Sequence, residues 1–311
     1  MAETALTLGN FDGVHCGHAA ILEAARARVG GGGQVVAVTF EPAPTEVLRP
    51  GTQPPRLMTA AARVTALRAA GADRVEVLAP DAAMLAQSPE AFIGGLVEAY
   101  RPGHILEGPD FRFGRGRAGD NAVLARLGQR LGFEAVEVPR RFGRLAGGWE
   151  APISSSLCRW LVGRGRVAEA ADCLGRPHRL TATIVRGEQR GRTLGIPTAN
   201  LDPAALAAMM TPRDGVYAAS ATVEGDAALR RPAAVSIGTK PTFGHPTLTV
   251  EAHLIDAADL GADALYGAVV HLDFRRFLRD QFRYAGVEAL VAQLQRDIAA
   301  SRTLGAASAG A

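Results

Sequence analysis

The first half of the chain alternates short apolar runs with segments in which apolar residues recur at helical spacing. Strand and helix in alternation are typical of a parallel, doubly wound α/β sheet, so residues 1–178 are predicted to form one α/β domain. The expected strands are 5–8, 34–40, 74–78, 103–106 and 134–138, and the expected helices are 19–29, 59–70, 89–100, 121–131, 155–162 and 167–173.

The pattern changes near residue 179, where short apolar runs separated by glycine and proline replace the helical segments. Such runs predict a small antiparallel β-barrel or sandwich over residues 179–302. A closing amphipathic helix is expected at 287–300, and the small residues 303–311 are expected to be a disordered tail. The expected strands of this domain are 180–185, 215–223, 232–237, 248–255 and 268–274.

Composition places the chain among ordinary globular proteins and excludes several classes. With 311 residues, 48% hydrophobic and 21% charged, it is long enough for two cores. The net charge of +3 comes without a basic stripe interleaved with aromatic residues, so no nucleic-acid partner is expected. Cys16, Cys158 and Cys173 form no CxxC pair, which favours a reducing compartment. No leader or long apolar span is evident, so a cytoplasmic protein without a membrane partner is predicted.

The segment GNFDGVHCGH, residues 9–18, places two imidazoles at a predicted turn from strand to helix. A helix N-terminus offers free N–H groups and a partial positive charge, which suit a phosphate. His15 and His18 beside it can stabilise the charge that builds when an α-phosphoryl group is attacked, and Gly17 lets the backbone approach a ligand closely. The pattern favours nucleotidyl transfer. A chance cluster and a weak metal site are the alternatives, although the spacing of a zinc site is missing.

Two further segments of the α/β domain carry phosphate or ligand chemistry. Ser154, Ser155 and Ser156 precede a helical pattern with Arg159 in its first turn, so hydroxyls and a guanidinium could bind phosphate, or simply cap the helix. Asp110 and Phe111 follow a predicted strand, at the edge where open α/β sheets bind ligands. A nearby GxGxxG string, residues 114–119, does not directly follow its strand and is not interpreted as a dinucleotide fingerprint.

In the second domain, Gly187, Gly191 and Gly195 permit a tight arch whose amides can face phosphate oxygens. Thr198 and Asn200 are two residues apart in an extended segment, so they are expected to point the same way. A hydroxyl and an amide oxygen so placed could hold a Mg²⁺–nucleotide, while a plain hairpin turn is the alternative. The chain has no P-loop string, so a kinase here would be of another class.

Glu251 lies in TVEAHL, residues 249–254, where polar and apolar residues alternate as in a half-buried strand. Two interpretations remain open for its carboxylate. It either faces solvent or acts as a general base that removes a hydroxyl proton as phosphoryl transfer begins.

The chain resembles the bacterial bifunctional riboflavin kinase/FAD synthetase family over nearly its whole length. The resemblance rests on the segments above and on the strings TFEPAP, GPDFRFG, DGVYAA, SIGTKPTF and LYG, which follow one another in the order found in that family. The resemblance implies a Rossmann-like nucleotidyltransferase domain followed by a riboflavin kinase barrel. It implies phosphorylation of riboflavin to FMN by ATP, then adenylylation of FMN to FAD with release of pyrophosphate. Mg²⁺ with ATP, and flavins as substrates and products, are therefore expected, and a homo-oligomer is left open.

The resemblance also implies roles for single residues. His15 and His18 would stabilise the adenylyl transition state, and Asp110 and Phe111 would lie beside the flavin and the nucleotide. In the kinase, Glu251 would be the base. The residues expected to bind nucleotide are Gly9, Asn10, Phe11, Gly17, Ser154, Ser155, Arg159, Gly187, Gly191, Gly195, Thr198 and Asn200, the last two through Mg²⁺.

Four positions depart from the family pattern. Ser156 replaces the threonine of the string ISST, and Lys240 replaces the arginine of the string IGTRPTF, which keeps the charge. Ala43 stands where the family string TFEPHP has histidine, and Glu107 stands where a small apolar residue is usual. Loss of one hydrogen bond to a charged group slows a step about 10- to 150-fold, so a weaker adenylyltransferase is expected. A kinase with a decayed α/β half and a non-catalytic flavin-binding protein are the alternative functions.

Overall fold

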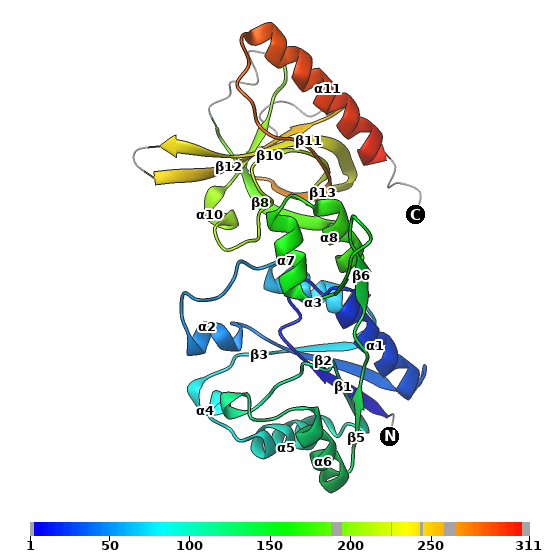
Figure 1. Cartoon of the computed structure of the whole chain (residues 1–311). Helices are drawn as coiled ribbons and strands as arrows, with labels where there is room; N and C mark the ends of the chain where they lie inside the picture. The colour runs from blue at the N-terminus through cyan, green and yellow to red at the C-terminus, as the bar shows by residue number, and fades with distance from the viewer. Residues whose placement is uncertain (1–2, 188–194, 225, 243–244, 258–264, 307–311) are drawn as a thin grey trace. The chain divides into compact units, whose positions relative to one another are not determined.

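A computed structural model of the chain describes residues 3–187, 195–224, 226–242, 245–257 and 265–306. It divides into two compact units (Figure 1). The N-terminal unit comprises Met1–Pro54 and Thr59–Ser155, and the C-terminal unit comprises Pro55–Met58 and Ser156–Ala311. The domain boundary predicted at residue 178 from the change of pattern stays a prediction.

The N-terminal unit is built on a parallel sheet with strand order β3-β2-β1-β4-β5, which confirms the doubly wound α/β fold. Helices α1 and α3 lie on one face of this sheet, and α5 and α6 lie on the other (Figure 1). The strands are β1 (Thr4–Leu8), β2 (Gln34–Phe40), β3 (Arg74–Leu78), β4 (His104–Glu107) and β5 (Glu134–Glu137), and the helices are α1 (Cys16–Val29), α2 (Pro44–Leu48), α3 (Ala60–Ala69), α4 (Ala82–Leu85), α5 (Pro89–Tyr100), η1 (Arg115–Arg117) and α6 (Asn121–Leu131). A short hairpin, β6 (Phe142–Arg144) and β7 (Glu150–Pro152), follows.

The strand order creates a crevice between β1 and β4. The ladder between β1 and β2 continues to Leu8 and Val38, whereas the ladder between β1 and β4 ends at Leu6 and Ile105. The carboxyl ends of β1 and β4 therefore separate at the point where the order of connection reverses. This is the position at which open α/β sheets bind ligands.

Local sequence explains why the helices of this unit begin and end where they do. Asp120 caps α6, because its carboxylate accepts a hydrogen bond from the amide of Val123 at 2.9 Å, and Gly132 ends the helix in the left-handed conformation. Leu124 and Leu127, on one face of α6, are buried in the core. Such periodic segments were predictable at their observed bounds.

The C-terminal unit is a closed barrel of antiparallel pairs with the order β10-β11-β12-β9-β8-β13, which confirms the predicted barrel. Helix α11 packs along β10 and β11 (Figure 1). The strands are β8 (His178–Val185), β9 (Ala199–Leu201), β10 (Gly215–Val223), β11 (Asp226–Thr242), β12 (His245–Leu254) and β13 (Val269–Arg279), and the helices are α7 (Ser155–Gly163), α8 (Val167–Leu174), α10 (Pro203–Leu206) and α11 (Val287–Ala306).

Two predicted helix ends need correction. Helix α11 continues to Ala306, so the predicted disordered tail from residue 303 is wrong for its first four residues, and residues 307–311 lie outside the described part. Alanine-rich sequence favours helix, and Ser301 is fully buried, which anchors the last turns. Helix α1 begins at Cys16 rather than at residue 19, because His15 caps it.

Helix α8 packs on β8 and β13, and its Val167 belongs to the barrel core. We therefore expect a fragment 156–306 to unfold at higher urea concentration than a fragment 180–306. Burial of one aliphatic side chain contributes about 1.5–3 kcal/mol, and Val167 is fully buried. Urea midpoints followed by circular dichroism check this, with Val167→Ala in the full chain as a control that should also be destabilised. Equal midpoints for the two fragments would show that α8 adds nothing to the barrel.

Candidate active sites

A cavity of about 320 Å³ in the C-terminal unit and one of about 410 Å³ in the N-terminal unit contain most of the predicted site residues. The N-terminal cavity lies in the crevice at the carboxyl ends of β1 and β4. Polar and aromatic side chains from four separate segments meet there. The predicted residues that line it are Gly9, Phe11, His15, Gly17, His18, Asp110, Phe111, Ser154 and Ser155.

The two imidazoles of the N-terminal cavity are held as a stacked pair. Their ring centroids are 3.6 Å apart with planes at 16°, and the edge of Phe11 packs against His18 at 5.0 Å. His15 is 6% exposed and caps α1, because its Nδ1 accepts a hydrogen bond from the amide of His18 at 3.3 Å. A neutral His15 therefore carries its proton on Nε2. Both rings sit at a helix N-terminus, where negative charge is stabilised.

The glycines of this turn make room for its rings. A Cβ at Gly17 would lie 3.1 Å from the His15 imidazole, and a Cβ at Gly9 would lie 3.3 Å from the ring of Phe11. Gly17 is therefore needed for the close approach of the His15 ring. The sequence predicted a glycine here for the approach of a ligand instead. Phe11 and Val14 both have positive φ angles, of 46° and 37°. Such backbone strain at non-glycine residues clusters at functional sites.

Asn10 lies differently from the other predicted residues of this turn. The side chain of Asn10 is exposed. The main-chain carbonyl oxygen of Asn10 accepts hydrogen bonds from Arg63 Nη1 at 3.2 Å and from Thr39 Oγ1 at 3.4 Å. Arg63, which is 5% exposed, also donates to the carbonyl of Phe40 and to the carboxylate of Glu41. Arg63 therefore ties the turn after β1 to the end of β2.

Arg63 was missed by sequence reasoning. The available signal was its place on α3, one turn before the buried Leu67 and hence on the apolar face of that helix. A charged residue there needs partners.

The serine segment contributes a second link to the same turn. Ser155 donates a hydrogen bond from Oγ to the carbonyl of Asp12 at 2.7 Å. Arg159, one turn further along α7, belongs to the C-terminal unit, where its Nε donates to the carbonyl of Pro55 at 2.8 Å. The role of Arg159 on ATP phosphates stays a prediction.

The loop after β4 completes the N-terminal cavity. Asp110 forms an ion pair with Arg140, and Phe111 stacks on Phe113 with centroids 5.1 Å apart. Two of the three glycines of the nearby GxGxxG string, Gly114 and Gly119, are required by packing, whereas Gly116 faces open space with a positive φ. A Cβ at Gly114 would lie 2.8 Å from the backbone of Pro89, and one at Gly119 would lie 2.7 Å from the ring of Phe113.

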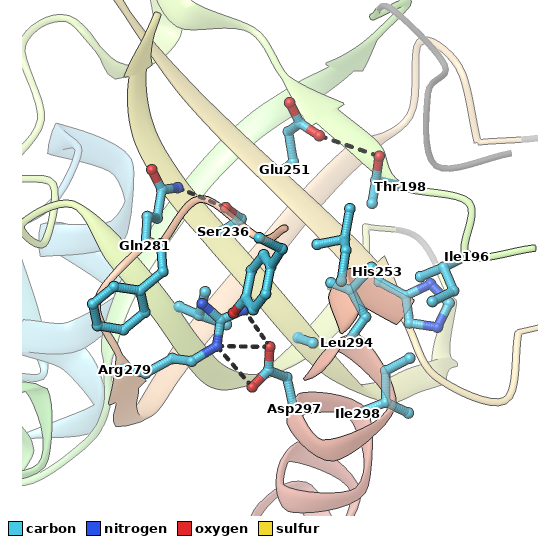
Figure 2. Close-up of a pocket in the computed structure, with 15 residues that line it drawn as sticks. Ile196, Thr198, Ser236, Glu251, His253, Arg279, Gln281, Leu294, Asp297 and Ile298 are labelled. Atoms are coloured by element: carbon cyan, nitrogen blue, oxygen red, sulfur yellow. Dashed lines mark hydrogen bonds and ion pairs between the residues drawn. The ribbon is translucent and has the colours of Figure 1, made fainter. Parts of the chain in front are cut away.

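The C-terminal cavity is lined by strands of the barrel and by α11 (Figure 2). Thr198 and Glu251 lie together at one end of it, where Thr198 Oγ1 donates to Glu251 Oε2 at 3.4 Å. Asn200 pairs with Glu251 across the β9–β12 ladder. Gly187 makes room for the Asn200 amide, since a Cβ there would lie 2.3 Å from its Nδ2. Gly195 has a φ of +71°, and Gly191 lies outside the described residues.

A buried ion pair joins β13 to α11 at the other end of this cavity (Figure 2). Arg279 Nη2 donates to Asp297 Oδ2 at 2.7 Å, and the Asp297 side chain is 5% exposed. Gln293, one turn earlier on α11, donates to Asp297 Oδ1 at 2.9 Å. Sequence reasoning missed this group. A polar pair with i, i+4 spacing inside the apolar stripe of α11 was the available signal.

The folds of the two units and their cavities define the class of protein to which this chain belongs. A parallel sheet with a paired-imidazole turn at its switch point is followed by a barrel with a hydroxyl–carboxylate pair, so the protein has a candidate active site in each of two domains. Family models agree: that of FAD synthetase matches residues 1–145, and that of riboflavin kinase matches residues 174–304.

Relatives align along nearly the whole chain. The bifunctional riboflavin kinase/FMN adenylyltransferase of Escherichia coli K12 is 35% identical over 94% of this chain and 90% of its own length. The protein of the same name from Pseudomonas fluorescens is 36% identical over 97% and 93%. A crystal structure described as a macrolide-efflux protein from Streptococcus pneumoniae superposes with a TM-score of 0.83 at 26% identity, over 97% of this chain and 94% of that one.

The chain therefore belongs to the bifunctional riboflavin kinase/FMN adenylyltransferase family, and it is an enzyme with both an FAD synthetase and a riboflavin kinase domain. This confirms the resemblance seen in its motifs. In the described part of the chain, no helix is both long and apolar enough to span a bilayer.

Proposed function

We propose that the N-terminal cavity performs adenylyl transfer. A phosphate oxygen of FMN attacks the α-phosphorus of ATP, the bond to the β-phosphate breaks, and FAD and pyrophosphate leave. The stacked pair of His15 and His18 at the N-terminus of α1 supports this proposal, because two imidazoles at the positive end of a helix would stabilise the charge that develops on an α-phosphate bound there. Ser154 and Ser155, in the same cavity, would donate to phosphate oxygens.

The C-terminal cavity would hold the kinase reaction. Glu251 accepts the proton of the ribityl 5′-hydroxyl, the hydroxyl oxygen bonds to the γ-phosphorus, and ADP leaves. Its carboxylate already accepts a hydrogen bond from Thr198, so its oxygens are placed to accept a proton at the cavity. Leu290, Leu294 and Ile298 of α11 give the same cavity an apolar wall suited to a flat isoalloxazine ring.

The donor set beside Glu251 suits Mg²⁺. Thr198 offers a hydroxyl oxygen and Asn200 an amide oxygen, and both belong to the hard oxygen ligands that this ion prefers. Bound with ATP, the ion would neutralise charge on the transferred phosphoryl group. A homo-oligomer and a cytoplasmic location stay predictions.

One assay tests both proposed sites. The full chain is incubated with riboflavin, ATP and Mg²⁺, and flavins are resolved by chromatography at successive times. We expect FMN to appear first and FAD afterwards, and both to fail when a chelator removes Mg²⁺. FMN without FAD would favour the alternative of a decayed α/β half, for which Ala43 and Glu107 are the motivating departures. No phosphorylated flavin at all would contradict the proposal.

A further inference from the structure

Glu107, the last residue of β4, is a buried carboxylic acid in the wall of the N-terminal cavity. Glu107 is only 3% exposed, and it lines the same cavity as His15 and His18. Glutamate is almost never fully buried unless it is paired. The adenylyl site described above gives this group no task.

The separation of β1 from β4 explains what the carboxyl contacts. Beyond the last ladder pair, Leu6 and Ile105, the amide of Leu8 has left the ladder to β4. It donates instead to Glu107 Oε1 at 2.6 Å, and Thr7 Oγ1 lies 3.5 Å from the same oxygen. The side chain of Glu107 therefore replaces a main-chain acceptor at the point where the crevice opens.

Burial raises the pKa of the Glu107 carboxyl well above its usual range, against the opposing effect of the hydrogen bonds from Leu8 and Thr7. Among the described residues, no basic side chain bonds to this carboxyl. The other titratable and charged groups around Glu107 come from three segments. His15 and His18 lie at the start of α1, and Asp110 follows β4. Glu137 ends β5, and Arg140 and Arg141 follow it.

We propose that Glu107 is a positioning residue of the adenylyltransferase site: its buried carboxyl fixes the end of β1 beneath the phosphate subsite by accepting from the amide of Leu8, and a negative charge at this position opposes binding of the anionic substrates. The proposal rests on the assignment of adenylyl transfer to this cavity. It also explains how the chain accommodates an acid where the family pattern has a small apolar residue.

The sign of the effect follows from the charges. As the pH rises through the elevated pKa of Glu107, the carboxyl loses its proton and a negative charge appears in a poorly solvated wall. ATP and FMN phosphates are then repelled, so adenylyl transfer falls as the pH rises through this pKa. At the effective dielectric of a partly buried site, one such charge lowers kcat/KM for ATP by roughly tenfold or more.

The test compares Glu107→Gln with the unaltered chain in FAD formation from FMN and ATP across neutral to alkaline pH. The amide keeps an acceptor for Leu8 and cannot ionise, so the fall in FAD formation with rising pH should disappear in this variant. Glu137→Gln is the matched control, because Glu137 is exposed and is the register partner of Glu107 on β5. That control should keep the alkaline fall. Riboflavin kinase activity of each sample should be the same in all three proteins.

Two results would overturn the proposal: an unchanged alkaline fall in Glu107→Gln, or loss of FAD formation by that variant at every pH with kinase activity intact. If the variant loses both activities, the unaltered chain labelled with ¹³C at glutamate carboxyls decides. One glutamate titrating above about pH 7 supports the proposal, and ordinary titration of all of them refutes it. Absence of FAD from the unaltered chain at every pH would instead refute the assignment of adenylyl transfer itself.

Discussion

Replacement of Glu251 by Gln is expected to lower FMN formation from riboflavin and ATP by about 10²- to 10⁴-fold, the usual contribution of a general base. Gln keeps the shape of the side chain and an acceptor for Thr198 Oγ1, but it cannot take up the ribityl proton. The loss should fall on kcat, with little change in KM for riboflavin. Steady-state kinetics of FMN formation, measured by chromatography, check this.

The same Glu251→Gln preparation provides its own control. FAD formation from added FMN should match that of the unaltered chain, because this reaction is assigned to the cavity of the N-terminal unit. His253→Ala, two residues along β12 in the same cavity, should cost far less, since His253 Nδ1 contacts only the carbonyl of Pro197 in the described structure. Full kinase activity in Glu251→Gln would exclude Glu251 as the base.

The second large effect is expected at the imidazole pair. His18→Ala should lower FAD formation from FMN and ATP by about 10²- to 10³-fold, as the loss of one preorganised group that stabilises transition-state charge does. His18 is a sharper probe than His15, because His15 also caps α1 and its loss would weaken the helix itself. FAD and pyrophosphate release, followed together, measure the effect.

His104→Ala is the matched control for His18→Ala. His104 lies at the amino end of β4, where it contacts Glu3 and Glu134, and it does not line the cavity. It should leave FAD formation nearly unchanged, and both histidine variants should retain kinase activity. If FAD formation is unaffected in His18→Ala, the imidazole pair has no part in the mechanism, and the turn has a structural rather than a catalytic role.

Long periodic segments were predictable from sequence alone. The observed bounds of β2, β3, α5 and α6 are those expected, because their apolar spacing and their caps agree. Short elements were not. Strand β9 spans only Ala199–Leu201 and depends on pairing with the distant strand β12. The β6–β7 hairpin pairs residues close in sequence, but its strands have too few apolar positions to establish a period.

The candidate sites show the same division between local and distant information. The GNFDGVHCGH segment identified His15 and His18 as candidates, and the extended segment with Thr198 and Asn200 identified Thr198, because residues close in sequence carry each pattern. Arg63 and the Arg279–Asp297 pair act across 53 and 18 residues of sequence, so a local pattern could mark Arg63 and Asp297 as polar residues on apolar helix faces but could not identify their partners. The sequence placed an extra negative charge at Glu107, whereas the structure shows a buried acid bonded to the amide of Leu8.

Crystallography of the full chain with Mg²⁺ and a non-hydrolysable ATP analogue tests most directly the central claim that one chain holds two separate nucleotide sites. One triphosphate should lie at the N-terminus of α1 against the His15–His18 pair, and a second should lie beside Thr198 and Asn200. Analogue bound at neither position, in crystals that carry it elsewhere, would contradict this account.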